Sequence, residues 1–216
     1  MILSSIGEVG IHVGNDVVVL RPSLYAMTQI GDPAYIVEVY ANVMADNCPA
    51  WALDSQFSCA YEVLLACTEQ DVTYLIGSYV HDTVLDRFKY EPGLIPKNEL
   101  LHLARCLLRH GVTGDVEPLP PEEGEEEGEE DYVTEFKARS HVANAVAHLG
   151  MSEKEAWTAT MTGLTEALRS KFPPVSKDEK AKAKATKPPT SAEYDATMEW
   201  ADKIEAKRKL RLGIKD

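Results

Sequence analysis

The chain has 216 residues, with 22 Lys and Arg against 35 Asp and Glu and a net charge of −13. This charge disfavours general nucleic-acid binding, because phosphates attract basic surfaces. The sequence has no apolar run near the roughly 18 residues of a membrane span, and its first residues lack the basic and apolar stretches of a secretory signal peptide, so we expect neither.

The charge is unevenly distributed along the chain. Residues 1–118 hold 6 Lys and Arg against 15 Asp and Glu, whereas residues 132–216 hold 16 against 12. Between them, the ten residues Glu122–Asp131 carry eight carboxylates and two glycines. Like charges at this density repel one another and bury no apolar surface. We therefore predict a flexible acidic linker at 119–131 that separates an N-terminal domain, residues 1–118, from a second module.

The N-terminal domain is predicted to open with a β-hairpin. Ile6–Val13 and Val17–Arg21 are β-prone runs, and Gly14-Asn15-Asp16 joins them. Gly and Asn tolerate the positive φ that tight hairpin turns require.

Two capped helices follow the hairpin. Ser23 can cap a short helix that extends through Gln29 and is closed by a glycine. Asp32-Pro33 is a favourable pair for the cap and first position of the next helix, which apolar spacing extends to about Met44.

Further elements complete the predicted N-terminal domain. Asp54 can cap a helix, and Val72–Ile76 is typical of a shorter one. Tyr79–Tyr90 mixes β-branched and aromatic residues with charged ones, which favours an extended segment or a second small hairpin. A strongly amphipathic helix from Asn98 is expected to stop with Gly111 as its C′ residue. The helix after Asp54 carries a wide apolar stripe: Phe57, Ala60, Tyr61, Leu64, Leu65 and Thr68.

Residues 132–174 are predicted to form a small three-helix module. Tyr132–Leu149 has helical apolar spacing, and Ser152 with Glu155 forms a capping box for a short second helix. Thr162 can cap a third helix, which two prolines end.

The rest of the chain is rich in lysine. Residues 175–190 contain mostly Lys, Ala and Pro, which is typical of a linker, and 191–216 has the pattern of a basic amphipathic helix. Taken together, the elements predict an α+β fold that is mainly helical, with an N-terminal hairpin and an all-α C-terminal module.

Catalytic and metal-binding signatures are absent from the sequence. The nearest metal motif is His102, Cys106 and His110, at successive four-residue steps on one predicted helix. At 1.5 Å rise per residue they span about 12 Å, too far for one ion with ligand bonds near 2 Å. We therefore expect no enzyme activity, no metal and no cofactor, with His110 interacting with its helix C-terminus.

Two groups of residues are candidates for binding a partner. The apolar face of the second module could bind one, although a module this small has few other residues to form its core, which favours the core. The basic tail could contact nucleic acid, an acidic partner or the acidic linker, or form a solvated helix end. The candidate residues are Trp157, Met161, Leu164, Leu168 and Phe172 on the module, and Lys207, Arg208 and Arg211 on the tail.

Several short motifs resemble proteins of phage tail gene clusters. The segment from Leu149-Gly150-Met151-Ser152 through Ala156-Trp157, continued by Met161-Thr162 and Phe172-Pro173, resembles the C-terminal part of tail assembly chaperones of long-tailed bacteriophages. The N-terminal part has motifs of the same kind: Ile6-Gly7-Glu8, Leu20-Arg21-Pro22-Ser23, Ile30-Gly31-Asp32-Pro33 and Ala104-Arg105 with His110-Gly111.

The resemblance implies a non-enzymatic scaffold. An N-terminal domain would coat the tape measure protein, and a C-terminal domain would recruit the tail tube protein. It also leaves open self-association of the N-terminal domain and production of the long form by frameshifting. The protein would act in the host cell cytoplasm and be absent from the mature virion. The alternative is a cytoplasmic nucleic-acid-associated regulator or adaptor that uses the basic C-terminal helix.

Overall fold

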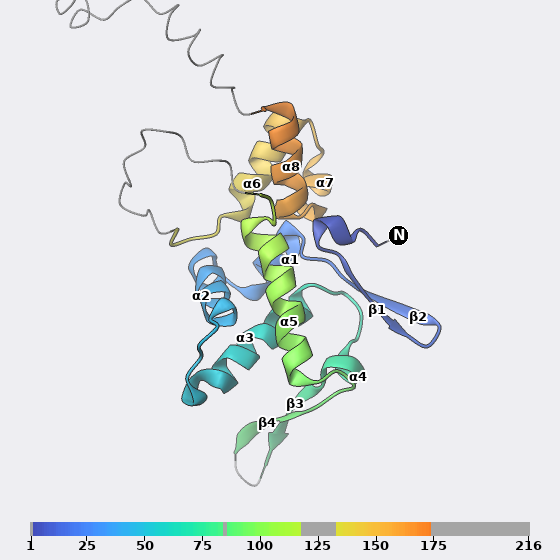
Figure 1. Ribbon diagram of the computed structural model, residues 1–216, viewed down its shortest axis with the longest axis vertical. Coiled ribbons are helices and arrows are strands. Elements are labelled where there is room, and N and C mark those ends of the chain that lie inside the picture. Colours follow the sequence, from blue (N-terminus) through green and yellow to red (C-terminus); the bar gives the residue numbers. More distant parts are fainter. Residues whose placement is uncertain (1, 84–85, 118–132, 174–216) are drawn as a thin grey trace, which may run out of the picture. The chain divides into compact units, whose positions relative to one another are not determined.

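The computed structural model describes residues 2–83, 86–117 and 133–173, whose arrangement is drawn in Figure 1. Residues up to Phe172 belong to one compact unit, and the second unit, Pro173–Asp216, lies outside the described residues except for Pro173. The linkers predicted at 119–131 and 175–190 and the helix predicted at 191–216 therefore fall outside the description.

The N-terminal hairpin is confirmed. Strands β1 (Val9–Val13) and β2 (Asp16–Leu20) pair antiparallel, and Gly14 in their turn has φ 60°. A 3-10 turn, Ser4–Ile6, precedes them and ends at Gly7, where φ is 89°. A Cβ atom on Gly7 would lie 2.3 Å from the Cβ of His110, so only glycine permits this close approach.

Helices α1 (Leu24–Ile30) and α2 (Pro33–Met44) begin and end close to the predicted residues. The Ser23 hydroxyl accepts a hydrogen bond from the Ala26 backbone N–H at 3.1 Å. The Asp32 carboxylate accepts two from the first turn of α2. These local caps explain why the start of each helix could be predicted from the sequence.

Helix α3 (Leu53–Ala66) begins before its predicted cap. Asp54 lies inside the first turn, and Ala52, at the end of a 3-10 turn, holds the cap position without a side-chain hydrogen bond. The short α4 (Thr73–Ile76) follows close to its predicted place.

The second hairpin is also present. Strands β3 (Ser78–Asp82) and β4 (Arg87–Glu91) pair antiparallel, with Tyr79 opposite Tyr90. Both rings pack against α3, where the centroid of Tyr61 lies 5.1 Å from that of Tyr79.

Helix α5 (Lys97–Leu108) ends before Gly111, but the helical chain does not stop at this glycine as predicted. It continues into a π-helical turn, Arg109–Thr113, that includes Gly111. A Cβ atom on Gly111 would lie 2.7 Å from the Met27 sulfur, so this glycine serves close packing rather than a left-handed cap. The prediction of a C′ glycine here was wrong.

The described part of the C-terminal half contains α6 (Ala138–Asn144), α7 (Glu153–Thr158) and α8 (Met161–Lys171), with a π-helical turn, Ala145–Leu149, after α6. The helix predicted from Tyr132 begins later, because the Phe136 backbone N–H donates to the Pro33 carbonyl at 2.8 Å. Ser152 forms the predicted capping box. Thr160 caps α8 in place of Thr162.

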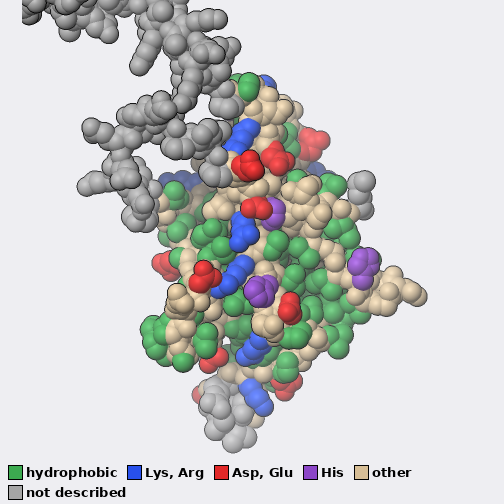
Figure 2. All heavy atoms as spheres, viewed as in Figure 1, with side chains coloured by type: hydrophobic (Ala, Val, Ile, Leu, Met, Phe, Trp, Pro, Cys, Tyr) green, Lys and Arg blue, Asp and Glu red, His purple; other side chains and the backbone are tan. Residues whose placement is uncertain are grey.

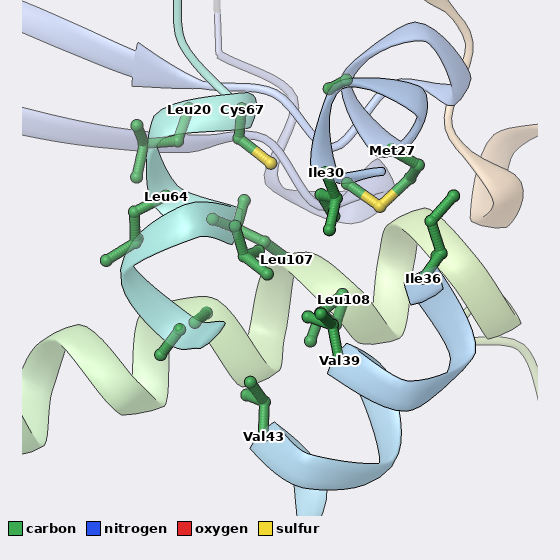
Figure 3. Packing of buried hydrophobic residues seen from close by; sticks show 14 of the residues in the cluster. Leu20, Met27, Ile30, Ile36, Val39, Val43, Leu64, Cys67, Leu107 and Leu108 are labelled. Atoms are coloured by element: carbon green, nitrogen blue, oxygen red, sulfur yellow. The ribbon is translucent and has the colours of Figure 1, made fainter. Parts of the chain in front are cut away.

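One core joins the two halves. Side chains of α1, α2, α3 and α5 point toward one another in Figure 3, where Met27, Ile36, Leu64 and Leu107 are labelled. The same cluster includes the following residues of the C-terminal half: Phe136, Ala138, Val142, Ala145, Ala156, Met161 and Leu164.

The structure thus differs from the expected separate module at 132–174. The apolar faces of α6, α7 and α8 pack in the core shared with the N-terminal helices, since a unit of this size buries little surface by itself. The predicted class, a mainly helical α+β fold with an N-terminal hairpin, is confirmed. No helix in the described ranges combines the length and the apolar character that crossing a membrane requires.

Candidate binding groove

Exposed apolar side chains are spread over the surface. On the face drawn in Figure 2, hydrophobic side chains (green) cover much of the area between scattered charged ones. More than half of a typical folded surface is apolar, so exposure alone does not identify a site. A concave surface with a few placed polar groups is a stronger indication.

An open groove of about 910 Å³ has this character. Its walls are formed by the end of β2 and the segment that leads into α1, by α1, by the C-terminal end of α3 with the loop after it, and by α7. The groove therefore brings together residues between 19 and 29, 65 and 70, and 154 and 158.

Apolar and aromatic side chains line part of the groove. Tyr25 is 54% exposed and Leu65 is 42% exposed, while Trp157 is half-buried. Leu24 and Ala26, the neighbours of Tyr25 on α1, are buried in the core, so the helical turn directs Tyr25 outward. These three side chains provide apolar contact area that the fold itself does not fully use.

A basic edge borders the apolar part. The Arg21 Nε donates to Glu8 Oε1 at 2.5 Å, and the other Glu8 oxygen accepts from the Leu3 backbone N–H at 2.9 Å. Glu8 is only 5% exposed, whereas the Arg21 side chain is 48% exposed. Lys154 on α7 and Glu69 after α3 are the other charged residues of the lining, so two cations and one anion line the groove, while Glu8, the partner of Arg21, does not line it.

The backbone around the groove is already hydrogen-bonded. The Arg21 N–H donates to the Cys67 carbonyl at 2.7 Å, and the Ser23 N–H donates to the Arg21 carbonyl at 2.9 Å. The Leu24 N–H donates to the Ala159 carbonyl at 2.9 Å. The segment that leads from β2 into α1 consequently offers side chains, and no unpaired backbone N–H at these three positions, to a partner.

Two nucleophilic side chains, Cys67 in the lining of the groove and Thr162 outside it, are buried. Burial raises the pKa of the Cys67 thiol well above its usual range and so disfavours the reactive thiolate. The Thr162 hydroxyl lies 2.8 Å from His110 Nδ1, and His110 Nε2 lies 3.7 Å from Asp115 Oδ2. Thr162 has no exposed surface and also accepts from the Asp115 N–H, so this arrangement fastens α8 to the end of α5.

The structure places His102 on α5 and His110 in the π-helical turn that follows it. Within residues 2–83, 86–117 and 133–173, no three His, Cys, Asp or Glu side chains lie in a metal-binding arrangement. His110 lies near its helix end as predicted, but its hydrogen-bond partner is Thr162 on α8.

The predicted apolar face is divided by the structure. Trp157 lines the groove, whereas Met161 and Leu164 are buried in the shared core. Leu168 is partly exposed, and Phe172 is 55% exposed. The tail candidates, Lys207, Arg208 and Arg211, lie outside the described residues.

Sequence reasoning missed most of the groove. Tyr25 and Lys154 were not among the predicted contact residues, and Leu65 was assigned to the apolar stripe of the helix after Asp54. One signal was available, because Arg21 is the only Lys or Arg among the first 86 residues. A lone cation placed directly after a strand is a reason to ask what it faces.

The fold and the groove define a mainly helical α+β protein with an open binding groove that is lined by side chains. The chain belongs to a family of unknown function, DUF6246, whose model matches residues 49–196. The match includes Leu65 and Trp157, whereas Arg21 and Tyr25 precede it. No curated protein and no solved structure matches the chain.

Proposed function

We propose that this protein is a non-enzymatic tail assembly chaperone of a long-tailed bacteriophage. In this role it binds the tape measure protein and recruits tail tube subunits in the host cytoplasm, and it is absent from the mature virion. The observation that carries the proposal is the open groove, where Tyr25, Leu65 and Trp157 leave apolar area unsatisfied.

The position of two motifs supports the proposal. Leu20-Arg21-Pro22-Ser23 and the segment that ends in Trp157 carry part of the resemblance to phage tail proteins, and both contribute to the groove. They are far apart in the sequence, so their meeting at one concave surface is a property of the fold.

A chaperone role matches the chemistry of the groove. A long helical client exposes an apolar stripe before assembly, and such surfaces aggregate unless they are covered. The groove can cover a short length of that stripe by contact alone. Catalysis is not needed, and the buried Thr162 and the protonated Cys67 do not offer it.

The single core alters the expected division of labour. The sequence suggested that separate modules hold the two partners, whereas both halves of the described chain build the same groove. We therefore assign the tape measure protein to the groove and the tube subunit to a surface outside it.

Coexpression with the partners tests the proposed function. The full chain is produced together with the tape measure protein and the tube protein from the same phage genome, and soluble complexes are isolated through a tag on this chain. We expect the tape measure protein to stay soluble and to copurify. An insoluble tape measure protein, with neither partner retained, contradicts the proposal.

Two tryptophan variants locate the client. Trp157→Ala should reduce copurification of the tape measure protein. Trp51→Ala is the matched control, because Trp51 is 86% exposed and does not line the groove. Equal retention by both variants would place the client elsewhere on the protein.

A further inference from the structure

We propose that the groove recognises an amphipathic helix whose apolar stripe is bordered by carboxylates. This inference rests on the proposed function and adds the chemistry by which the groove selects its client. Three features of the groove support it in turn: its bonded backbone, its apolar side chains and its basic edge.

The backbone between β2 and α1 favours a helix over an extended peptide. A strand that adds to a sheet needs unpaired N–H and C=O groups along an edge. At the groove, the N–H groups of Arg21, Ser23 and Leu24 already donate to carbonyls of the protein, and the Cys67 and Ala159 carbonyls already accept. A helix satisfies its own backbone and needs only side-chain contacts from the groove.

The apolar side chains suit one face of such a helix. Tyr25, Leu65 and Trp157 come from three different elements, α1, α3 and α7, and together line one concavity. An amphipathic helix presents apolar residues at intervals of three and four, which form one apolar stripe along the helix. Tyr and Trp are also the residue types that contribute most often to binding energy at interfaces.

The basic edge determines which charge is favoured on the residues that border the apolar stripe of the bound helix. The lining holds Arg21 and Lys154 against Glu69, whereas the whole chain carries a net charge of −13. Glu8, which is 5% exposed, holds the Arg21 guanidinium by its Nε, so the cation is fixed in place before a partner arrives. Glu8 balances the charge of Arg21, but among the described residues it is bonded to Nε alone, so the terminal guanidinium N–H groups can still donate to a carboxylate, and Lys154 repels an amine.

A matched pair of synthetic peptides tests the inference on the full-length protein. Both peptides have about 18 residues and the same leucine stripe, bordered by Glu in one and by Lys in the other. Trp51 and Trp200 are changed to Phe so that Trp157 fluorescence reports on the groove. We expect the Glu-bordered peptide to bind at least tenfold more tightly, with a difference that shrinks as salt is raised.

A charge reversal in the groove is the second arm. Lys154→Glu should reduce or reverse the preference between the peptides. Lys89→Glu is the matched control, since Lys89 is an exposed lysine on β4 that does not line the groove. Equal binding of both peptides overturns the inference, and so does a preference that Lys154→Glu leaves unchanged.

The outcomes separate this inference from the proposed function. Binding of the Glu-bordered peptide without copurification of the tape measure protein keeps the groove chemistry and rejects the chaperone role. Copurification that Lys154→Glu and Trp157→Ala leave unchanged keeps the chaperone role and rejects the groove as its site.

Discussion

Two aromatic regions of the molecule differ in how many contacts their side chains make within the fold. The aromatic cluster consists of Phe57, Tyr61, Tyr79 and Tyr90, between α3 and the second hairpin. Its rings meet edge to face or tilted, with Phe57 and Tyr90 centroids 4.8 Å apart. The Tyr61 hydroxyl donates to the Gly77 carbonyl at 3.0 Å and the Tyr90 hydroxyl to the Ile76 carbonyl at 2.6 Å.

The groove presents aromatic side chains in another state. Tyr25 is 54% exposed, and neither it nor Trp157 has an aromatic partner among the described residues. The cation of each region also has a different partner. Lys97 Nζ lies 4.6 Å from the centroid of the Phe57 ring in the aromatic cluster, whereas the half-exposed Arg21 of the groove is paired with a carboxylate. Aromatic residues that contact one another stabilise the fold, and those left without such contacts are available to a partner.

The largest expected effect is on stability, in the aromatic cluster. Phe57→Ala should lower the free energy of unfolding by about 3–5 kcal/mol, because it removes a large buried side chain and leaves a cavity. Urea denaturation of the full chain measures it. Phe88→Ala is the control, since Phe88 is 70% exposed on β4, and should cost less than about 1 kcal/mol. Similar losses in the two variants would contradict the distinction between satisfied and unsatisfied rings.

The second prediction concerns the carboxylate that holds the basic edge of the groove. Glu8→Gln should lower the free energy of unfolding by about 1–3 kcal/mol, because the nearly buried Glu8 bonds both Arg21 Nε and the Leu3 N–H.

Asp46→Asn is its control in the same denaturation experiment. Asp46 is 86% exposed and lies 3.4 Å from the Arg105 guanidinium, so its loss should cost less than about 0.5 kcal/mol. If both variants lower the free energy of unfolding by the same amount, burial of Glu8 does not strengthen its bonds to Arg21 and Leu3.

Local chemistry explains which parts of the fold the sequence predicted. Caps at Ser23, Asp32 and Ser152 were located correctly, because each depends on side-chain and backbone groups within three residues. The predicted cap at Thr162 was wrong, since the chain stays extended through Thr160, which bridges to Ser23 in the N-terminal half. A choice between two threonines two positions apart is decided by a distant contact.

The groove was less predictable for the same reason. Trp157 was proposed as a contact residue, but Tyr25 and Leu65 lie on helices far from it in sequence. The acidic run at 122–131 suggested a boundary between modules, although apolar faces on both sides of it share one core. A charge pattern reports on solvation of its own segment and carries no information on which apolar faces meet.

The third prediction compares an exposed aromatic residue of the groove with one that lies outside both regions. Tyr25→Ala should weaken binding of the Glu-bordered peptide about tenfold, equivalent to about 1.4 kcal/mol, because it removes one apolar wall of the groove. The unfolding midpoint should stay within a few degrees. Phe88→Ala, exposed outside the groove, should leave peptide affinity unchanged. Weaker binding in both variants would indicate non-specific apolar contact.

The smallest expected effect is at the start of α7, the helix that carries Trp157. Glu155 and Ser152 form its capping box, and the hydrogen bonds from Ser152 hold the pKa of the Glu155 carboxyl below its usual value of 4.5. Because the folded-state pKa is lowered, this contribution to stability is complete above pH 4.5 and is lost as pH falls through the folded-state pKa. Fraying of α7 under these conditions should change Trp157 fluorescence before the aromatic cluster changes, in the chain whose other two tryptophans are replaced by Phe.

Ser152→Ala isolates this contribution. It should lower the melting temperature at neutral pH by about 2–4 °C, as expected for loss of an N-cap, and flatten the change in Trp157 fluorescence below pH 4.5. Near-ultraviolet circular dichroism reports the tyrosine-rich cluster over the same pH range. A cluster signal that changes together with Trp157 fluorescence in the chain that retains Ser152 would mean that the two regions unfold as one, and that the groove has no separate response to pH.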